Sequence, residues 1–471
     1  MVPKGNGVGN IWGEYIPVTV FVSLLFLTCI VSASATVRPV EEWNKSFGGP
    51  LSEECRHVKQ TSDGGYILTG FTYSSTNGQS DLWVVRTDPR GNQLWAQNYG
   101  GTGDDAGHYV FETPEQGFLL AGTTRSYGSG DYDAWLLKTD PLGKVLWEKT
   151  YGGPRVDNFR QVRPANDGGY IAVGSTSSYG KGRFDLWLVK TDLNGNKTWD
   201  KTFGGPSNDE GFRVTPTPDN GYIITGYTES SGSGGKDIWM IKTDLYGNKI
   251  WDKTFGGSLD DDGRSVKNTE DGGFIVSGYT DAFGSGGYDF WEIKTDSMGN
   301  RQWDKTFGGT YDDINRPVLA TDDGGYVLGG WTGSKGAGGL DGWIVKTDPM
   351  GIMQWNMTLG GPKDDKIIAL NQTSDGGFVG CGSTESFAVG ETDLWFVKIG
   401  LPGEGTGTIS GPLTAGSAIE SIKTESGTRP GAAPQAGGLT PATTQAYIPL
   451  SLTLISIVIA CSAILHGRNL R

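Results

Sequence analysis

Residues 251–302 read WDKTFGGSLDDDGRSVKNTEDGGFIVSGYTDAFGSGGYDFWEIKTDSMGNRQ, and similar stretches precede and follow them along the chain. The stretch opens on Trp251 and contains a second tryptophan, Trp291. Each belongs to a series with a constant spacing of 52 residues: Trp43, Trp95, Trp147, Trp199, Trp251, Trp303 and Trp355, and Trp83, Trp135, Trp187, Trp239, Trp291, Trp343 and Trp395. These series contain all but two of the 16 tryptophans. A fixed period of this length indicates a repeat architecture, in which every unit buries its apolar face against its neighbours.

One unit has four segments with the alternating or β-rich pattern of short strands. They are Arg264–Asn268, Gly273–Thr280, Asp289–Thr295 and Arg301–Phe307. Glycine-containing turns at 270–272 and 296–300 predict tight hairpins between the first two segments and between the last two. Seven units of this kind predict an all-β fold, a seven-bladed β-propeller of four-stranded blades over residues 36–400.

The two ends of the repeat region predict how the ring closes. The last unit ends at its third strand, Asp393–Ile399, and the first begins with an unpartnered fourth strand, Glu41–Phe47. We expect this N-terminal strand to complete the last blade, because that pairing removes two open sheet edges. Cys55 and Cys381 then lie in adjacent blades. A disulfide is one interpretation; two small buried residues is the preferred one, because other repeats hold Thr, Ala, Val, Ser or Gly where Cys381 stands.

The run GGSLDDDGRSVKNTEDGGFIVSGYT and its six counterparts resemble the seven-bladed β-propeller repeats of archaeal and bacterial cell-surface proteins. The resemblance covers residues 41–400. It implies a propeller at the cell surface, accompanied by a signal peptide and a membrane anchor. It implies little about activity, because no catalytic motif is shared by that group.

The regions outside the repeats are consistent with export. Residues 15–31 are apolar and precede Ala33-Ser34-Ala35, which predicts a signal peptide over 1–35, with an uncleaved anchor as the alternative. Residues 401–445 are rich in Gly, Ser, Thr and Pro and predict a flexible stalk. Residues 446–466 predict a C-terminal transmembrane helix, and 467–471 a cytoplasmic tail. The net charge of −14 argues against a nucleic-acid partner.

No group of residues forms a recognisable catalytic constellation, and no catalytic residue is predicted. An acidic position recurs ten residues after each leading tryptophan, and we expect these side chains to ring one mouth of the central channel: Glu53, Asp105, Asp157, Asp209, Asp261, Asp313 and Asp365. The preferred interpretation is a structural ring of turn caps and of ion pairs with Arg56, Arg160, Arg264 and Arg316. The alternative is a divalent cation such as calcium, the only cofactor considered, at Asp261 and Asp313.

The loops that differ most between units, such as 125–132, 177–184 and 333–340, should share one face with the crossings between blades. We call this the variable face, and the opposite one the hairpin face. Aromatic and charged residues on it are candidates for ligand binding: Tyr127, Tyr179, Arg183, Phe283 and Trp331. Glycosylation is predicted at the sequons of Asn44, Asn196, Asn356 and Asn371.

Three functions are compatible with these patterns. The favoured one is a membrane-anchored extracellular β-propeller that acts as a surface recognition or adhesion module for a glycan or protein ligand. A structural component of the cell envelope is the first alternative, and an extracellular glycosidase or lyase is the second. The sequence identifies no ligand.

Overall fold

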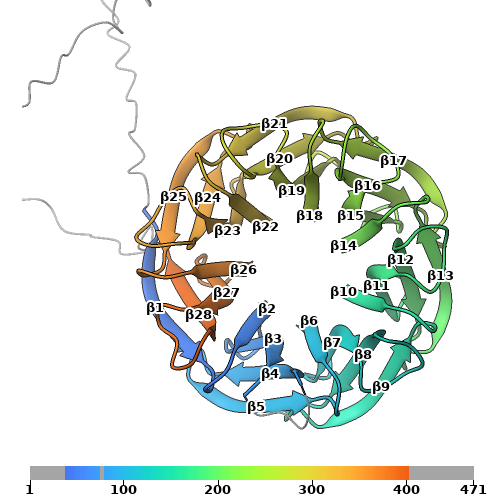
Figure 1. Ribbon diagram of the computed structural model, residues 1–471, viewed down its shortest axis with the longest axis horizontal. Coiled ribbons are helices and arrows are strands. Elements are labelled where there is room, and N and C mark those ends of the chain that lie inside the picture. Colours follow the sequence, from blue (N-terminus) through green and yellow to red (C-terminus); the bar gives the residue numbers. More distant parts are fainter. Residues whose placement is uncertain (1–37, 75–78, 402–471) are drawn as a thin grey trace, which may run out of the picture. The chain divides into compact units, whose positions relative to one another are not determined.

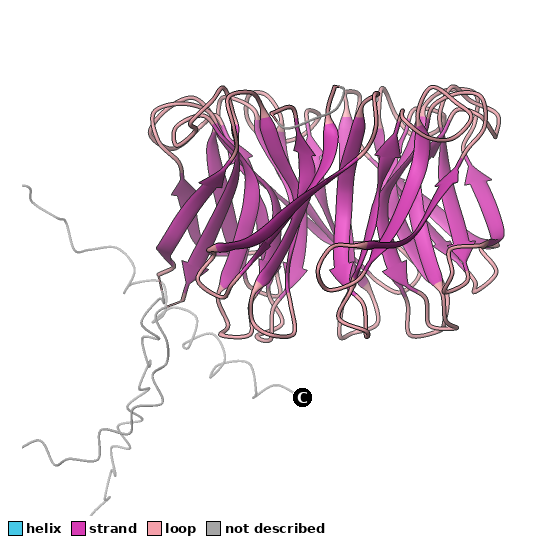
Figure 2. Ribbon diagram, turned by 90° about the horizontal axis from the view of Figure 1, so that it is seen from below, coloured by secondary structure: helices cyan, strands magenta, loops and turns pink. Residues whose placement is uncertain are grey.

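The computed structural model describes residues 38–74 and 79–401, and this part of the chain is a ring of seven antiparallel sheets around a central channel (Figure 1). Each sheet has four strands and forms one blade, with its first strand at the hub and its last at the rim. Seen from the side, the strands run between two faces that carry all the loops (Figure 2).

From hub to rim the strands follow chain order in six blades, and in the seventh the N-terminal strand β1 lies outside β28. The first four blades are β2 (Glu53–Gln60), β3 (Tyr66–Thr72), β4 (Asp81–Thr87) and β5 (Gln93–Tyr99); β6 (Asp105–Glu112), β7 (Phe118–Thr124), β8 (Asp133–Thr139) and β9 (Val145–Tyr151); β10 (Asp157–Pro164), β11 (Tyr170–Thr176), β12 (Asp185–Thr191) and β13 (Lys197–Phe203); and β14 (Asp209–Pro216), β15 (Tyr222–Thr228), β16 (Asp237–Thr243) and β17 (Lys249–Phe255). The other three are β18 (Asp261–Asn268), β19 (Phe274–Thr280), β20 (Asp289–Thr295) and β21 (Arg301–Phe307); β22 (Asp313–Ala320), β23 (Tyr326–Thr332), β24 (Asp341–Thr347) and β25 (Met353–Leu359); and β26 (Asp365–Gln372), β27 (Phe378–Thr384), β28 (Asp393–Gly400) and β1 (Val40–Phe47).

The predicted four-stranded blade is confirmed, with two boundaries to correct. The third and fourth strands of the fifth blade have the expected limits, but the first begins at Asp261 rather than at Arg264 and the second at Phe274 rather than at Gly273. Asp261 pairs with Thr280 of β19, and the register then shifts between Gly263 and Ser265. This β-bulge interrupts the alternation on which the sequence reading relied, so the start of the strand was missed.

Ring closure by the N-terminal strand is also confirmed. β1 pairs with β28 in antiparallel register, with Trp43 opposite Lys398 and Phe47 opposite Leu394. In Figure 1 the blue strand β1 lies beside the orange strand β28. The pairing supplies a rim strand to a blade that would otherwise expose the edge of β28.

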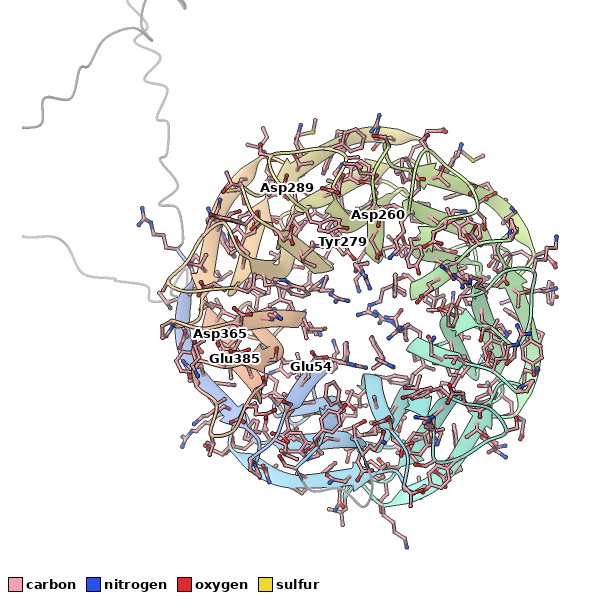
Figure 3. The ribbon with its side chains drawn as sticks, in the orientation of Figure 1. Glu54, Asp260, Tyr279, Asp289, Asp365 and Glu385 are labelled. Atoms are coloured by element: carbon pink, nitrogen blue, oxygen red, sulfur yellow. A yellow bond between two sulfur atoms is a disulfide. The ribbon has the colours of Figure 1, made fainter. Side chains whose placement is uncertain are left out.

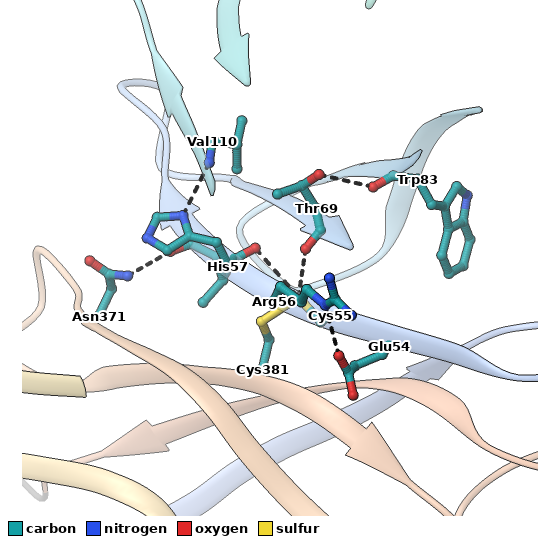
Figure 4. Close-up of a disulfide and its surroundings, with 10 residues drawn as sticks. Glu54, Cys55, Arg56, His57, Thr69, Trp83, Val110, Asn371 and Cys381 are labelled. Carbon is teal, nitrogen blue, oxygen red and sulfur yellow. Dashed lines mark hydrogen bonds and ion pairs between the residues drawn. A yellow bond between two sulfur atoms is a disulfide. The ribbon is translucent and has the colours of Figure 1, made fainter. Parts of the chain in front are cut away.

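The preferred interpretation of the two cysteines was wrong, because Cys55 and Cys381 form a disulfide (Figure 4). Their Cα atoms are 5.7 Å apart, well within the range a disulfide can span. β2 and β27 belong to the two blades that meet at the closure, and both side chains point into the apolar core between those blades. The prediction failed because Cys381 was compared with the residues at its own position in the other repeats. That comparison gives no information about its contact with Cys55 in the next blade.

The hydrophobic core is divided into clusters that each join two neighbouring blades. In one of them, Ile238 and Met240 of the fourth blade pack with Phe274 and Trp291 of the fifth. The outer tryptophans connect blades as well: a Cβ on Gly299 would come 2.7 Å from the ring of Trp251 in the preceding blade. Gly299 also has a φ of 74°, where residues with a side chain are strained. The constant 52-residue period preserves these contacts.

Several predictions concern residues outside the described part of the chain. The signal peptide (1–35), the stalk from residue 402 onward, the membrane helix (446–466) and the tail (467–471) all lie there. Within residues 38–74 and 79–401, no helix long and apolar enough to cross a bilayer is found.

Candidate functional site

The acidic residues expected at the channel mouth lie instead between the strands of the blades. The carboxylate of Asp209 accepts hydrogen bonds from the hydroxyls of Thr228 and Ser230 and from the backbone N–H of Gly205. Asp157 has the same arrangement, and both side chains are 0% exposed. Successive side chains point to opposite sides of a strand, so the position of Asp209 faces the blade core while the next position faces the channel. The predicted location around the mouth is therefore wrong, but the predicted turn-capping role is confirmed, because these carboxylates accept hydrogen bonds from the crossing loops.

The predicted cation site at Asp261 and Asp313 gains no geometric support. Both side chains are 0% exposed, and they belong to neighbouring blades. Asp261 accepts a hydrogen bond of 2.8 Å from the backbone N–H of Gly257. Among the residues that the structure describes, no three carboxylate, histidine or cysteine side chains meet in a metal-binding arrangement.

Three of the predicted ligand-binding aromatics on the variable face also contribute to their own blades. The rings of Tyr127, Tyr179 and Phe283 pack on the buried third-strand tryptophans, with ring centroids 5.1–5.8 Å apart. The hydroxyl of Tyr179 donates to the carbonyl of Gly152 in the crossing loop, at 2.6 Å, and Tyr127 does the same to Gly100. All three remain about two-fifths exposed, so part of each ring is accessible on this face. Arg183 is exposed in the loop between β11 and β12.

Trp331 is placed differently, because it faces the central channel. It lines a cavity of about 400 Å³ together with Glu54, Arg56, His108, Arg160, Phe212, Arg213, Arg264, Arg316, Lys366 and Ile368. We call this the channel cavity. Figure 3 shows side chains from several blades reaching into the central opening, with Glu54 at its edge.

The channel cavity opens on the variable face. A neighbouring hollow of about 350 Å³ shares Arg56, His108 and Arg160 with it and extends to Tyr73 and Tyr132 in the variable loops. The hub strands supply its lining because the position of Arg264 in each repeat points inward. That position holds Arg56, His108, Arg160, Phe212, Arg264, Arg316 and Ile368.

The arginines of the channel cavity lie against aromatic rings. Arg264 lies over Phe212, with its guanidinium carbon 4.0 Å from the ring centroid, and Arg316 lies 5.1 Å from that of Trp331. Arg56 lies over Phe71 at 4.7 Å. Contacts of this kind hold a guanidinium by its face and leave the N–H groups at its edge free to donate.

Carboxylates neutralise only part of this charge. Arg56 pairs with Glu54 at 2.9 Å and Arg264 with Asp262 at 2.7 Å. Arg160 lies 3.8 Å from Glu210. Within the described part of the chain, the remaining cations of the lining have no carboxylate at ion-pair distance: Arg213, Arg316 and Lys366.

Crowding of like charges affects the protonation of the channel side chains. Burial, followed by the neighbouring Arg264, lowers the pKa of Arg316 to about 9, so it stays charged at neutral pH. Burial lowers the pKa of His108 well below its usual value, and Arg56 lowers it further. His108 is therefore neutral, and its Nδ1 lies 3.0 Å from Nη1 of Arg56, where it accepts a hydrogen bond.

The positive charge continues deeper into the channel. His57 stacks on Tyr109 with ring centroids 3.8 Å apart, and Arg163 lies over the same tyrosine at 5.5 Å. Burial, followed by Arg163, Arg213 and Lys59, lowers the pKa of Lys267 well below its usual value. The hub is thus rich in basic side chains in a protein of net charge −14.

The four predicted glycosylation sites differ in accessibility. Asn196 and Asn356 are exposed, while Asn44 on β1 is half-buried. Asn371 donates from Nδ2 to the carbonyl of Val58 across the closure, at 2.6 Å. Nδ2 is the atom that would carry a glycan, so attachment at Asn371 would place the sugar on an atom already bonded to Val58.

The closed ring of seven four-stranded blades makes this chain a seven-bladed β-propeller. No protein-family profile and no curated protein matches the sequence. Among solved structures, the WD40 domain of Pan2 from Neurospora crassa is similar with a TM-score of 0.50 and 9% identity, covering 78% of this chain and 97% of that one. Sqt1 from Chaetomium thermophilum gives 0.44 and 11%, covering 72% and 82%, and a fungal alcohol oxidase complexed with copper gives 0.43 and 12%, covering 77% and 76%. At these identities the likeness concerns the fold alone.

Proposed function

We propose that the chain is a recognition module of the cell surface that binds its ligand at the mouth of the central channel. The observation that carries the proposal is the channel cavity, which combines donor-rich and aromatic side chains and opens among loops that differ from blade to blade. A concave site of about 400 Å³ with a few convergent polar groups has the size and character of a small-ligand or chain-end site.

Binding is favoured over glycoside hydrolysis by the lining itself. Hydrolysis of this kind generally needs two carboxyl groups flanking the scissile bond. The channel cavity has one carboxylate in its lining, Glu54, and this group is paired with Arg56.

The proposal also places the protein at the cell surface, and this part of it rests on the sequence alone. A signal peptide directs export, the helix at 446–466 anchors the chain, and the stalk holds the propeller outside while the C-terminus is cytoplasmic. The partner is then an extracellular glycan or protein. Protease digestion of intact cells tests the topology: the propeller should be cleaved and an epitope after residue 466 protected, whereas protection of both would contradict it.

Binding of the full-length protein to a glycan array tests the function. We expect Trp331→Ala to reduce binding at least tenfold, because this indole lies in the channel cavity. Tyr179→Ala combined with Arg183→Ala should weaken binding if the ligand extends onto the variable loops. Leu193→Ala, on an exposed hairpin, is the matched control. Binding that depends only on hairpin-face residues, or no binding to any glycan or envelope protein, would contradict the proposal.

A further inference from the structure

We propose that the channel cavity is a polyanion site, which takes a compact ligand carrying at least two carboxylate, phosphate or sulfate groups. This inference rests on the proposed function, because it names the ligand class of the same site. It includes the acidic sugar at the end of a glycan chain as well as free small polyanions.

Local charge opposes the charge of the whole protein. The chain has 39 basic and 53 acidic residues, yet the channel cavity is lined by Arg56, Arg160, Arg213, Arg264, Arg316 and Lys366 against the single carboxylate Glu54. Glu210 and Asp262 lie behind the lining, paired with Arg160 and Arg264. A concave site lined by one sign of charge and surrounded by low-dielectric walls concentrates ligands of the opposite sign.

The lining also has hydrogen-bond donors that the protein itself does not use. Arg316 is held over Trp331, and no acceptor from the described residues bonds to its guanidinium; its buried Nε is unsatisfied. The buried Nε atoms of Arg160 and Arg264 likewise have no partner. The Arg316 side chain as a whole is partly exposed, so an anion in the cavity can accept from its guanidinium and pair with its charge.

Lys366 extends this free donor surface by one blade. Its ammonium group is 5.9 Å from the ring of Trp331, on which Arg316 also lies, and it has no carboxylate at ion-pair distance in the described part of the chain. Two cations from adjacent blades therefore lie within 6 Å of one indole ring. Two cations in one cavity bind two anionic groups better than one, which favours a polyanion over chloride or a monocarboxylate.

The dimensions and the overall charge restrict the class of ligand further. A cavity of about 400 Å³ accommodates a molecule such as a tricarboxylate, a diphosphate or one acidic sugar residue. A nucleic-acid duplex does not fit within it, and the acidic exterior of the protein repels an extended phosphate backbone.

Isothermal titration of the full-length protein tests the proposal with three probes: citrate, pyrophosphate and an oligogalacturonate. We expect at least one to bind with a dissociation constant below about 1 mM, and binding to weaken steeply as NaCl is raised. A preference for oligogalacturonate would identify a glycan as the source, and a preference for citrate or pyrophosphate a free small anion. Failure of all three to bind at 50 mM NaCl would overturn the proposal.

Arg316→Gln and Lys366→Gln test the position of the site, because neither change leaves a carboxylate partner unpaired. Each should weaken binding at least tenfold. Arg301→Gln is the matched control, since Arg301 lies on a rim strand away from the channel and pairs with Asp304 beside it. Equal affinity in all three variants would overturn the proposal. If a neutral glycan binds and Trp331→Ala abolishes this, while no polyanion binds, the recognition function stands and the polyanion inference alone fails.

Discussion

Asp157 and Arg160 are three residues apart on β10, yet one serves the blade and the other the channel. Asp157 is buried and bonded to Ser178 and the backbone of Gly153, whereas Arg160 lines the channel cavity. The sequence revealed both residue types at a fixed spacing and suggested that they form ion pairs with each other. Side chains three positions apart on a strand point to opposite sides, which places Asp157 in the blade and Arg160 in the channel. The β-bulge between Phe159 and Gln161 then changes the register of the residues that follow, and such a bulge is not visible in residue spacing.

The buried carboxylates should be sensitive to the loss of a single donor. Thr228→Val keeps the shape of the side chain but removes the hydroxyl that bonds to Asp209. We expect the free energy of unfolding to fall by about 1–3 kcal/mol, because a buried carboxylate loses a partner. Thr150→Val on the exposed rim strand β9 is the control and should change it by less than about 0.5 kcal/mol. Equal, small effects in urea denaturation would show that the bond contributes little.

Glu292 is a second residue at which the surroundings of a carboxyl group affect stability. At this position the other repeats hold apolar residues: Val84, Leu136, Leu188, Met240, Ile344 and Phe396. It is 0% exposed, and burial raises the pKa of its carboxyl from 4.5 to about 8. The folded state therefore retains the proton at pH values where the unfolded chain has lost it. Its contribution to stability is complete below about pH 4.5 and is lost as the pH rises through 8.

Glu292→Met should remove this pH dependence. We expect the variant to be more stable than the parent at pH 9, by an amount on the order of 5 kcal/mol, and the difference to shrink toward pH 4.5. Denaturation curves at a series of pH values measure this. A constant difference across the series would contradict a raised pKa.

At the scale of strands and hairpins, most of the fold could be predicted because each repeat has the same sequence pattern of strands and turns. The limits of β20 and β21 were predicted to the residue, and the pairing of β1 with β28 was predicted with each strand one residue shorter than observed. The two hairpins of each unit have turns specified by glycine and aspartate, which fix where the strands end. The starts of the hub strands were missed, because the crossing loop and the bulge conceal their alternation.

Removal of β1 should destabilise the ring far more than removal of the C-terminal tail. A chain that begins at residue 50 lacks the strand that covers β28, and Trp43 no longer packs on Phe396, whose ring centroid is 4.8 Å away. We expect the melting temperature to fall by roughly 10 °C or more, or the protein to aggregate through the exposed edge. A chain ending at residue 401 should melt within about 2 °C of the parent. Similar melting temperatures for both truncations would contradict closure by β1.

At the scale of the whole molecule, the ring creates contacts and surfaces that no single repeat contains. The disulfide joins residues 326 positions apart, and the channel cavity combines side chains from different blades. Trp331 was predicted because it departs from the repeat pattern. Arg56, Arg160, Arg264 and Arg316 were noticed, but their common location in the channel was not. Because this arginine position recurs along the chain, it was interpreted as structural. The side chains at this position in all seven repeats point inward and together line the channel cavity.

The disulfide should stabilise the closed ring. Cys55→Ala with Cys381→Ala should lower the free energy of unfolding by about 2–4 kcal/mol, because the bond restricts a very long loop in the unfolded chain. A reductant should lower the melting temperature of the parent protein and leave that of the double variant unchanged. If the reductant affects both proteins alike, the bond is not the cause.

The most direct test of the central claim is a crystal structure of the full-length protein soaked with the tightest-binding of the three polyanions. The account predicts that the ligand lies in the channel cavity, with anionic oxygens within hydrogen-bond distance of the Arg316 guanidinium and the Lys366 ammonium group. A ligand bound at the rim or on the hairpin face, with neither cation in contact, would contradict it.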